Sequence, residues 1–210
     1  IPVAMGANNP LRRELEIAPS VHGDSGLDGP ELPQPKEEAL KISAFELMAK
    51  VVEESDEKIT LVPTGPLTNI AIFLLSYPHL KSKIERISLM GGSAIGGNWT
   101  ASAEFNILVD PEAADIVFKS GIPITMSGLD VTHKAQVYPE DIEKIKNQGG
   151  KVAVMLGELL EFFIKFHKEI CGWEFAPLHD PCAVAWLINP DMFTSKKLNV
   201  QIDIDGEHTT

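Results

Sequence analysis

The sequence predicts an α/β protein in which an open, mostly parallel sheet is flanked by helices and followed by a helical C-terminal part. Strand-like apolar runs alternate with helix-like segments through residues 59–127. Parallel strands need such crossovers, which place helices on both faces of the sheet. Beyond Tyr138 the segments are mostly helical. Because the 210 residues are 44% apolar and no linker or repeat divides them, we expect a single domain over residues 1–210.

The elements can be placed in order from hydrophobic periodicity and from residues that begin or end helices. For example, Asp110 is an expected N-cap, followed by Pro111 in the first turn and Gly121 after the last. We expect strands in residues 1–7, 58–63, 84–92 and 122–130, and helices in residues 36–55, 65–78, 110–121, 138–150, 152–170 and 180–190. Residues 197–206 look like a further strand that ends in a hairpin turn at Asp205-Gly206. The sheet predicted is Rossmann-like.

Charge and cysteine content exclude several classes of partner. The formal net charge is −12 with a pI near 4.9, so neither nucleic acid nor an anionic membrane surface is an expected partner. The apolar runs are shorter than the ~18 residues that suggest a membrane span. Cys171 and Cys182 form no CxxC motif, which favours two buried thiols in a reducing compartment and therefore a cytoplasmic location.

Polar side chains gather in the segments that follow the predicted strands, where open parallel sheets bind ligands. These segments contain no GxGxxG or GxxxxGK[ST] motif, which argues against phosphate binding and against a sugar kinase. Their amides and carboxylates suit a polyhydroxyl ligand such as a sugar, or a hard cation such as Ca²⁺. Local explanations also exist, because Asn, Ser and Gly favour turns, His179 is compatible with a capping or core role, and Asp180 is a possible N-cap. The polar residues are Thr64, Thr68, Asn69, Asn98, Glu104, Asn106, His179 and Asp180.

Five segments together resemble the ribonucleoside hydrolases of the inosine–uridine and pyrimidine-preferring kind. They are HGDSGLDGP (22–30), LVPTGPLTNIA (61–71), LMGG (89–92), GN with SAEFNILVDPEAA (97–114), and HDPCAVAWLINP (179–190). The resemblance runs through nearly the whole chain and implies hydrolysis of the N-glycosidic bond of ribonucleosides to free base and ribose. It also implies an open α/β fold, a bound Ca²⁺ ion and a homodimer or homotetramer.

The resemblance assigns roles to individual residues. Asn98, Glu104 and Asn106 resemble the residues that bind the ribose hydroxyls, with Phe105 contributing through its main chain or through packing. Asp180 is similar to a calcium ligand and Thr64 to a carbonyl ligand of the same ion, whereas His179 is similar to the histidine proposed to protonate the departing base. His22 and Met90 match positions that line the pocket. Trp99, Phe163 and His167 are further candidates for the base side, and core packing or a surface position is preferred for the last two.

One part of the family pattern is absent. The amino-terminal DxDPGxDD motif does not occur in the sequence, and with it are missing the general-base aspartate and two further metal ligands. The final strands beyond residue 210 are missing as well. We therefore expect an interior fragment that is inactive alone, whose parent is a Ca²⁺-dependent nucleoside hydrolase. The alternative is a non-catalytic nucleoside- or sugar-binding protein that uses the same polar loops.

Overall fold

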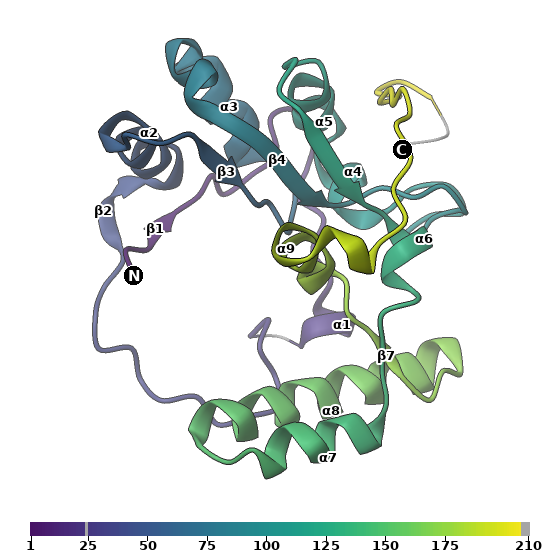
Figure 1. Cartoon of the computed structure of the whole chain (residues 1–210). Helices are drawn as coiled ribbons and strands as arrows, with labels where there is room; N and C mark the ends of the chain where they lie inside the picture. Colours follow the sequence, from purple (N-terminus) through teal and green to yellow (C-terminus); the bar gives the residue numbers. More distant parts are fainter. Residues whose placement is uncertain (24, 207–210) are drawn as a thin grey trace. The chain divides into compact units, whose positions relative to one another are not determined.

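The computed structural model describes residues 1–23 and 25–206, without the side chain of His22. The chain folds into two compact units, shown in Figure 1. Unit 1 comprises Ile1–Leu15, Glu38–Thr132 and His179–Thr210, and unit 2 comprises Glu16–Glu37 and His133–Leu178. Each unit is described separately below, and the expected single domain stays a prediction.

The sheet of unit 1 confirms the expected parallel α/β architecture. Strands β3 (Ile59–Leu61), β4 (Ile84–Met90) and β5 (Ile124–Ser127) are parallel and adjacent in that order. A second parallel pair joins β1 (Ala4–Met5) to β2 (Leu40–Ser43). The predicted strands lie in the right places because their apolar, β-branched runs suit strands buried on both faces.

Alternate residues of β4 face different helices, as the two-residue period of a strand requires. Ile87 and Leu89 belong to the main core, which also contains buried residues of α2, α3 and α5. Ser88 instead donates a hydrogen bond to the carbonyl of Ala183 in α9, at 2.8 Å, and Met90 packs with Ala183. Helices therefore cover both faces of this sheet (Figure 1).

The helices of unit 1 begin and end close to the predicted positions. The Asp110 side chain caps α5 by accepting a hydrogen bond from Ala113 N, as expected. A short helix, α4, was not predicted and begins directly after Glu104. The helical elements of this unit are α2 (Ala44–Glu54), α3 (Thr68–Ser76), the 3₁₀ helix η1 (Pro78–Lys83), α4 (Phe105–Val109), α5 (Pro111–Phe118), α6 (Leu129–Thr132), α9 (Asp180–Ile188) and the 3₁₀ helix η2 (Pro190–Met192).

Two sequence predictions in unit 1 were wrong. The helix expected over residues 36–55 starts only at Ala44, because Ser43 and Glu46 form a reciprocal capping box and residues 40–43 pair with β1 as a strand. No strand forms in residues 197–206. Instead Asp203 Oδ1 accepts hydrogen bonds from the backbone N–H groups of Asp205 and Gly206, which closes a local turn. The second strand expected for that hairpin lies outside the described residues.

Unit 2 is mainly helical, in agreement with the sequence pattern beyond Tyr138. Its core contains Ile142 of α7 and Leu160 and Ile164 of α8, with residues of a short antiparallel strand pair. Gly172, in the left-handed conformation, ends the long helix α8. No helix in residues 1–23 and 25–206 is long and apolar enough to cross a membrane. The elements of this unit are α1 (Pro19–His22), β6 (Gln136–Val137), α7 (Pro139–Asn147), α8 (Lys151–Cys171) and β7 (Ala176–Pro177).

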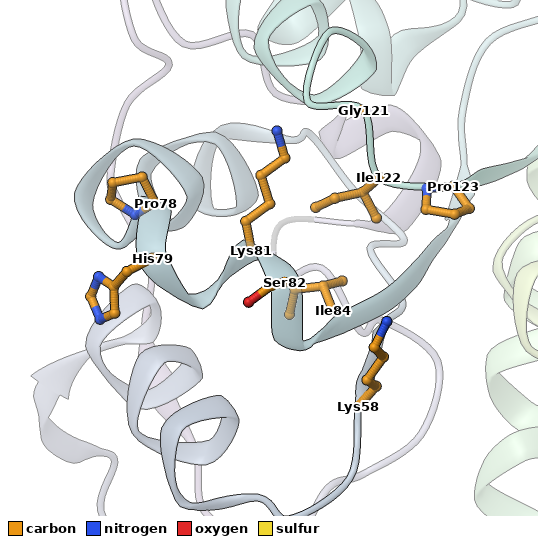
Figure 2. A pocket seen from close by; sticks show the side chains of 9 residues that line it. All are labelled: Lys58, Pro78, His79, Lys81, Ser82, Ile84, Gly121, Ile122 and Pro123. Carbon is orange, nitrogen blue, oxygen red and sulfur yellow. The ribbon is translucent and has the colours of Figure 1, made fainter.

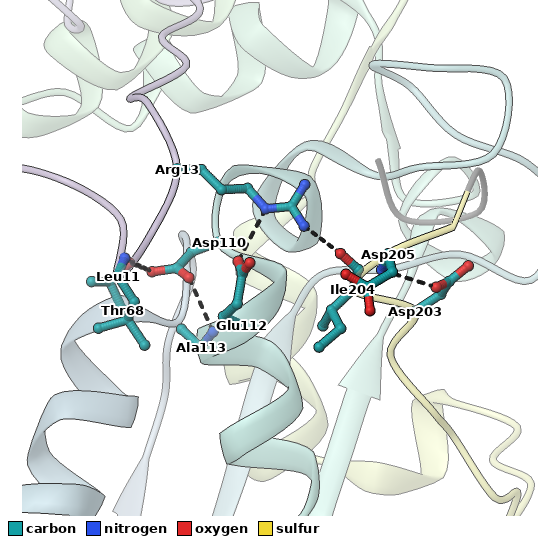
Figure 3. A network of polar contacts seen from close by, with 9 residues as sticks. All are labelled: Leu11, Arg13, Thr68, Asp110, Glu112, Ala113, Asp203, Ile204 and Asp205. Atoms are coloured by element: carbon teal, nitrogen blue, oxygen red, sulfur yellow. Dashed lines mark hydrogen bonds and ion pairs between the residues drawn. The ribbon is translucent and has the colours of Figure 1, made fainter.

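A buried carboxylate joins distant segments of unit 1. Asp110 is fully buried, and its Oδ2 accepts hydrogen bonds from Leu11 N at 2.9 Å and from the Thr68 hydroxyl at 2.6 Å. Nearby, Arg13 pairs with Glu112 at 3.0 Å and donates to the carbonyl of residue 204 at 2.6 Å (Figure 3). These bonds fix the first fifteen residues onto α3 and α5, so Asp110 is expected to contribute strongly to stability.

Candidate functional site

The carboxyl ends of the three parallel strands lie side by side in unit 1. Met90 N donates to the carbonyl of Pro63 at 3.0 Å, and Gly91 N donates to the carbonyl of Ser127 at 3.2 Å. The segments after β3, β4 and β5 therefore start from one edge of the sheet. Thr64, which follows Pro63, is exposed at this edge. This is the edge at which open α/β sheets bind ligands.

The loop after β4 is held in a tight turn by its own backbone. The N–H of Gly97 donates to the carbonyl of Ala101 at 3.0 Å, and Asn98 N donates to the carbonyl of Ala103 at 3.2 Å. The hydroxyl of Thr100 accepts from Ala103 N at 2.9 Å. A Cβ atom at Gly97 would lie 2.2 Å from the carbonyl oxygen of Ala103, so this turn has no room for a side chain.

The close packing at Gly97 leads to a testable prediction. Gly97→Ala is expected to lower the free energy of unfolding by about 1–3 kcal/mol, the usual cost of forcing atoms into a packed site. Gly65→Ala is the matched control, because a Cβ atom there would meet no atom within 4 Å. Urea titration of both variants measures the difference. Equal midpoints for the two variants would show that the turn rearranges without cost.

Glu104 is the N-cap of α4 and is 3% exposed. Its Oε2 accepts hydrogen bonds from Gly92 N at 2.9 Å and Ile107 N at 3.3 Å, and its Oε1 accepts one from Asn106 N at 3.0 Å. Burial raises the pKa of the Glu104 carboxyl, and the backbone hydrogen bonds oppose that change. A carboxylate offers about four lone-pair positions. Glu104 thus joins the loop after β4 to helix α4, and its Oε1 can still accept a hydrogen bond from a ligand hydroxyl.

Asn98 and Asn106 flank Glu104 in the sequence and offer hydrogen-bond donors and an acceptor on their side-chain amides. Asn106 is 8% exposed, and its Nδ2 donates to the carbonyl of Met90 at 3.1 Å and contacts the Met90 sulfur at 3.2 Å. Asn98 is exposed, and its Oδ1 accepts from Phe105 N at 2.9 Å. Within the described residues, Oδ1 of Asn106 and Nδ2 of Asn98 have no hydrogen-bond partner. One amide therefore offers an acceptor and the other offers donors, which a sugar hydroxyl can satisfy together.

Aromatic and apolar side chains support this polar group. The rings of Trp99 and Phe105 meet edge to face, with centroids 4.9 Å apart. Met90, which the resemblance places along the pocket, is 2% exposed and packs with Leu129 and Ala183. Its observed contact with the candidate site is through Asn106. The pocket-lining role of Met90 and the role of Phe105 stay predictions.

Asp180 lies close to this group despite its distance along the sequence. It is the first residue of α9, which packs against β4 and β5. Although part of the residue reaches solvent, burial by surrounding protein atoms raises the pKa of its carboxyl. Its negative charge adds to the burial that raises the pKa of Glu104. The structure therefore brings Asn98, Glu104, Asn106 and Asp180 into one region of unit 1.

His179 is held by a residue that the sequence analysis did not select. Its Nδ1 lies 2.8 Å from Oγ1 of Thr132, which is fully buried at the end of α6. His179 itself does not cap α9 through its side chain. The signal for Thr132 was its place in GLDVTH after a predicted strand, but nothing in that pattern indicates contact with residue 179.

The described residues do not by themselves provide a calcium shell. Ca²⁺ takes about six to eight oxygen ligands, usually with several carboxylates. In residues 1–23 and 25–206, no group of three or more His, Cys, Asp or Glu side chains is arranged to hold a metal ion. Asp180 and the carbonyl of Thr64 are the two ligands suggested by the resemblance, so the remaining oxygens would have to come from elsewhere.

Three further candidates belong to unit 2. The side chain of His22 lies outside the described residues, so its suggested role cannot be placed. His167 is buried, its Nδ1 donates a hydrogen bond to the Phe163 carbonyl at 2.8 Å, and its ring packs against those of Phe163 and Trp173. Phe163 packs against the core of unit 2, so both side chains have packing contacts there, and a role on the base side stays a prediction for both.

A shallow cavity of about 440 Å³ occurs at the opposite edge of the same sheet. Figure 2 shows its lining, which includes Lys58, His79, Lys81 and Ser82 before the starts of the strands. These four side chains are exposed, and Lys58 lies 4.0 Å from Glu85. Since this cavity lies at the amino ends of the strands and lacks buried polar groups, the carboxyl edge remains the better candidate site.

Comparison with known proteins identifies the family of the chain. Residues 1–210 match the family described as inosine-uridine preferring nucleoside hydrolase. The chain is 60% identical over 210 residues to the pyrimidine-specific ribonucleoside hydrolase RihA of Photobacterium profundum, covering 100% of this chain and 68% of that protein. It is 56% identical to RihA of Escherichia coli K12, with the same coverage.

A solved structure shows the same fold. The purine-preferring ribonucleoside hydrolase from Gardnerella vaginalis superposes with a TM-score of 0.92 at 34% identity, covering 99% of this chain and 68% of that one. The chain thus spans about two thirds of the length of these relatives. With a match over its full length and this level of identity, the chain belongs to the inosine-uridine preferring nucleoside hydrolase family.

Proposed function

We propose that the protein hydrolyses the N-glycosidic bond of ribonucleosides to give free base and ribose. The observation that carries this proposal is the group of Asn98, Glu104 and Asn106 at the carboxyl edge of the sheet, close to Asp180, in a chain that matches the nucleoside hydrolases throughout. Amide and carboxylate groups that are oriented by hydrogen bonds suit the vicinal hydroxyls of ribose.

Pyrimidine ribonucleosides are the proposed substrates. The relatives at 56–60% identity are named pyrimidine-specific, whereas the solved relative named purine-preferring is 34% identical. We therefore expect kcat/KM for uridine or cytidine to exceed that for inosine. Release of base from the three nucleosides by the full-length protein tests both the reaction and this preference. A binding protein would instead hold uridine stoichiometrically and release no ribose.

The chemistry assigned to this chain has two parts. Glu104 and the two asparagines hold the ribose hydroxyls, and their hydrogen bonds strengthen as positive charge develops on the sugar. His179 donates a proton from Nε2 to the base as the C1′–N bond breaks and its electron pair passes to the base. Water forms the new bond to C1′, and the proton that this water releases restores the imidazolium through solvent.

Substitution of Glu104 separates transition-state stabilisation from simple binding. Glu104→Gln in the full-length protein is expected to lower kcat more than it raises KM, because the charged acceptor matters most when the ribosyl group becomes cationic. It also places an amide N–H₂ against at least one backbone donor, which costs about 1–3 kcal/mol of stability. Steady-state kinetics at a temperature where the variant is folded measures the first effect. An unchanged kcat with a raised KM would mark Glu104 as a uniform binder.

We further propose Ca²⁺ as the bound metal, with Asp180 and the Thr64 carbonyl among its oxygen ligands. The hard oxygen donors of the Asp180 carboxylate and the Thr64 carbonyl support this assignment. When bound, the ion would supply Lewis-acid activation of water. Asp180→Asn in the full-length protein is expected to weaken calcium retention at least about tenfold, in line with the loss of a charged ligand. Retention equal to wild type would remove Asp180 from the ligand set.

We also propose a cytoplasmic location and self-association of the protein. The expectation of two buried thiols was wrong for Cys171, which is exposed, whereas Cys182 is buried. Neither cysteine forms a disulfide within the described residues, which agrees with a cytoplasmic location. Exposed apolar side chains of unit 1, such as Ile188 and Met192, agree with self-association as a homodimer or homotetramer. Light scattering of the full-length protein measures the second property.

A further inference from the structure

Thr132 and His179 are the residues at which the chain leaves unit 1 and returns to it. The segment between them, His133–Leu178, belongs to unit 2. Within unit 1, Oγ1 of Thr132 and Nδ1 of His179 are 2.8 Å apart, and Thr132 is fully buried. A fixed partner on one ring nitrogen sets the orientation of an imidazole and decides which nitrogen keeps its proton.

The Thr132 hydroxyl is itself held firmly beside the candidate site. Thr132 N donates to the carbonyl of Gly128 at 3.0 Å, and Leu129 N donates to the carbonyl of Gly92 at 3.0 Å. Leu129 is fully buried. A Cβ atom at Gly128 would lie 2.9 Å from the carbonyl oxygen of Gly92, so the two loops approach as closely as their backbones allow. The turn that carries Thr132 is therefore fixed relative to the loop after β4.

We propose that Thr132 is a positioning residue for His179 and that its Oγ1 accepts the hydrogen bond from Nδ1–H. This proposal rests on the proposed function. As the C1′–N bond breaks, the base takes the proton from Nε2, and the ring is left neutral with its remaining proton on Nδ1. Thr132 stabilises that tautomer. The opposite arrangement, in which the hydroxyl donates to Nδ1, would keep on Nε2 the proton that the base needs.

Two variants of the full-length protein test the role of the hydroxyl. Thr132→Val keeps the shape of the side chain but has no hydroxyl, whereas Thr132→Ser keeps the hydroxyl and is the matched control. For uridine, Thr132→Val is expected to lower kcat about 10- to 100-fold, the range seen when a hydrogen-bond partner that orients a metal-binding histidine is removed. KM should change little, and Thr132→Ser should retain most of the wild-type activity. For p-nitrophenyl riboside, which needs little protonation of its leaving group, the loss of kcat in Thr132→Val should be much smaller.

The positioning role would be overturned if Thr132→Val lost equal activity on both substrates. It would also be overturned if Thr132→Val and Thr132→Ser had equal kcat on uridine. Nitrogen-15 NMR of wild-type His179 gives a test that does not depend on the variants folding. The neutral ring is expected to carry its proton on Nδ1, and a proton on Nε2 would contradict the proposal. If the wild-type protein released no base from uridine, the proposed function itself would be wrong. If the wild type were active and Thr132→Val had the same kcat, only the role of Thr132 would be rejected.

Discussion

Replacing His179 by alanine in the full-length protein is expected to lower kcat on uridine by about 10²–10⁴-fold, the usual contribution of general acid catalysis. The imidazole is placed for this role by its 2.8 Å contact with the buried Thr132 hydroxyl, at the start of the helix that carries Asp180. A pyrimidine leaving group must be protonated as it departs. The loss should be much smaller with p-nitrophenyl riboside, whose leaving group is stable as an anion.

The comparison of two substrates distinguishes catalysis from support. If His179 only supports the backbone near Asp180, its removal should slow both substrates equally and should weaken calcium retention. Rates on uridine and p-nitrophenyl riboside, with the calcium content of the same preparation, therefore form one experiment. Parallel losses would exclude the general-acid role.

Replacing Asp110 by asparagine is expected to lower the free energy of unfolding by about 3–5 kcal/mol, because hydrogen bonds to a buried charged group are worth about 1.5–3 kcal/mol each. The Oδ2 atom of Asp110 accepts from Leu11 N and the Thr68 hydroxyl, and Oδ1 caps α5 at Ala113 (Figure 3). An amide nitrogen in either position would face a donor. The first residues of the chain would then lose their attachment to α3 and α5.

A carboxylate on the same helix provides the control. Asp115 is paired with the exposed Lys119 four residues later. Asp115→Asn is expected to cost less than about 1 kcal/mol, since exposed ion pairs contribute little. Denaturant unfolding of the two variants under identical conditions gives the comparison. Similar midpoints would show that the Asp110 network does not stabilise unit 1.

Most strands and helices were predicted correctly because they depend on interactions between residues that are close in the sequence. The run from Ile84 to Met90 favours a buried strand, and Asp110-Pro111 begins a helix through capping that involves neighbouring residues. The error at residues 36–55 has a similar origin. The apolar spacing continues into Leu40 and Ile42, but pairing with β1 outweighs helix propensity there, and the Ser43 capping box starts the helix later.

Less of the candidate site could be predicted from local sequence patterns. Asn98, Glu104 and Asn106 were found because they lie within one short loop after a strand. The helix-capping bonds of Glu104 come from Asn106 and Ile107, whereas only the folded loop brings Gly92 N to the carboxylate. Thr132 was missed because its contact with His179 depends on tertiary structure across an intervening unit. Hydrogen bonds of this kind leave no periodic signal in a sequence.

Product analysis of a uridine reaction tests the central claim most directly. Proton NMR of full-length protein with excess uridine should show uracil and ribose in equal amounts, far beyond one equivalent per protein chain. Asn98→Ala should slow that release while leaving the unfolding midpoint near wild type, because Asn98 is exposed and, among the described residues, its side chain only accepts a hydrogen bond from Phe105 N. Uridine that remains intact while bound to the wild-type protein would contradict the proposed hydrolysis, and an Asn98→Ala rate equal to wild type would contradict the location of the site.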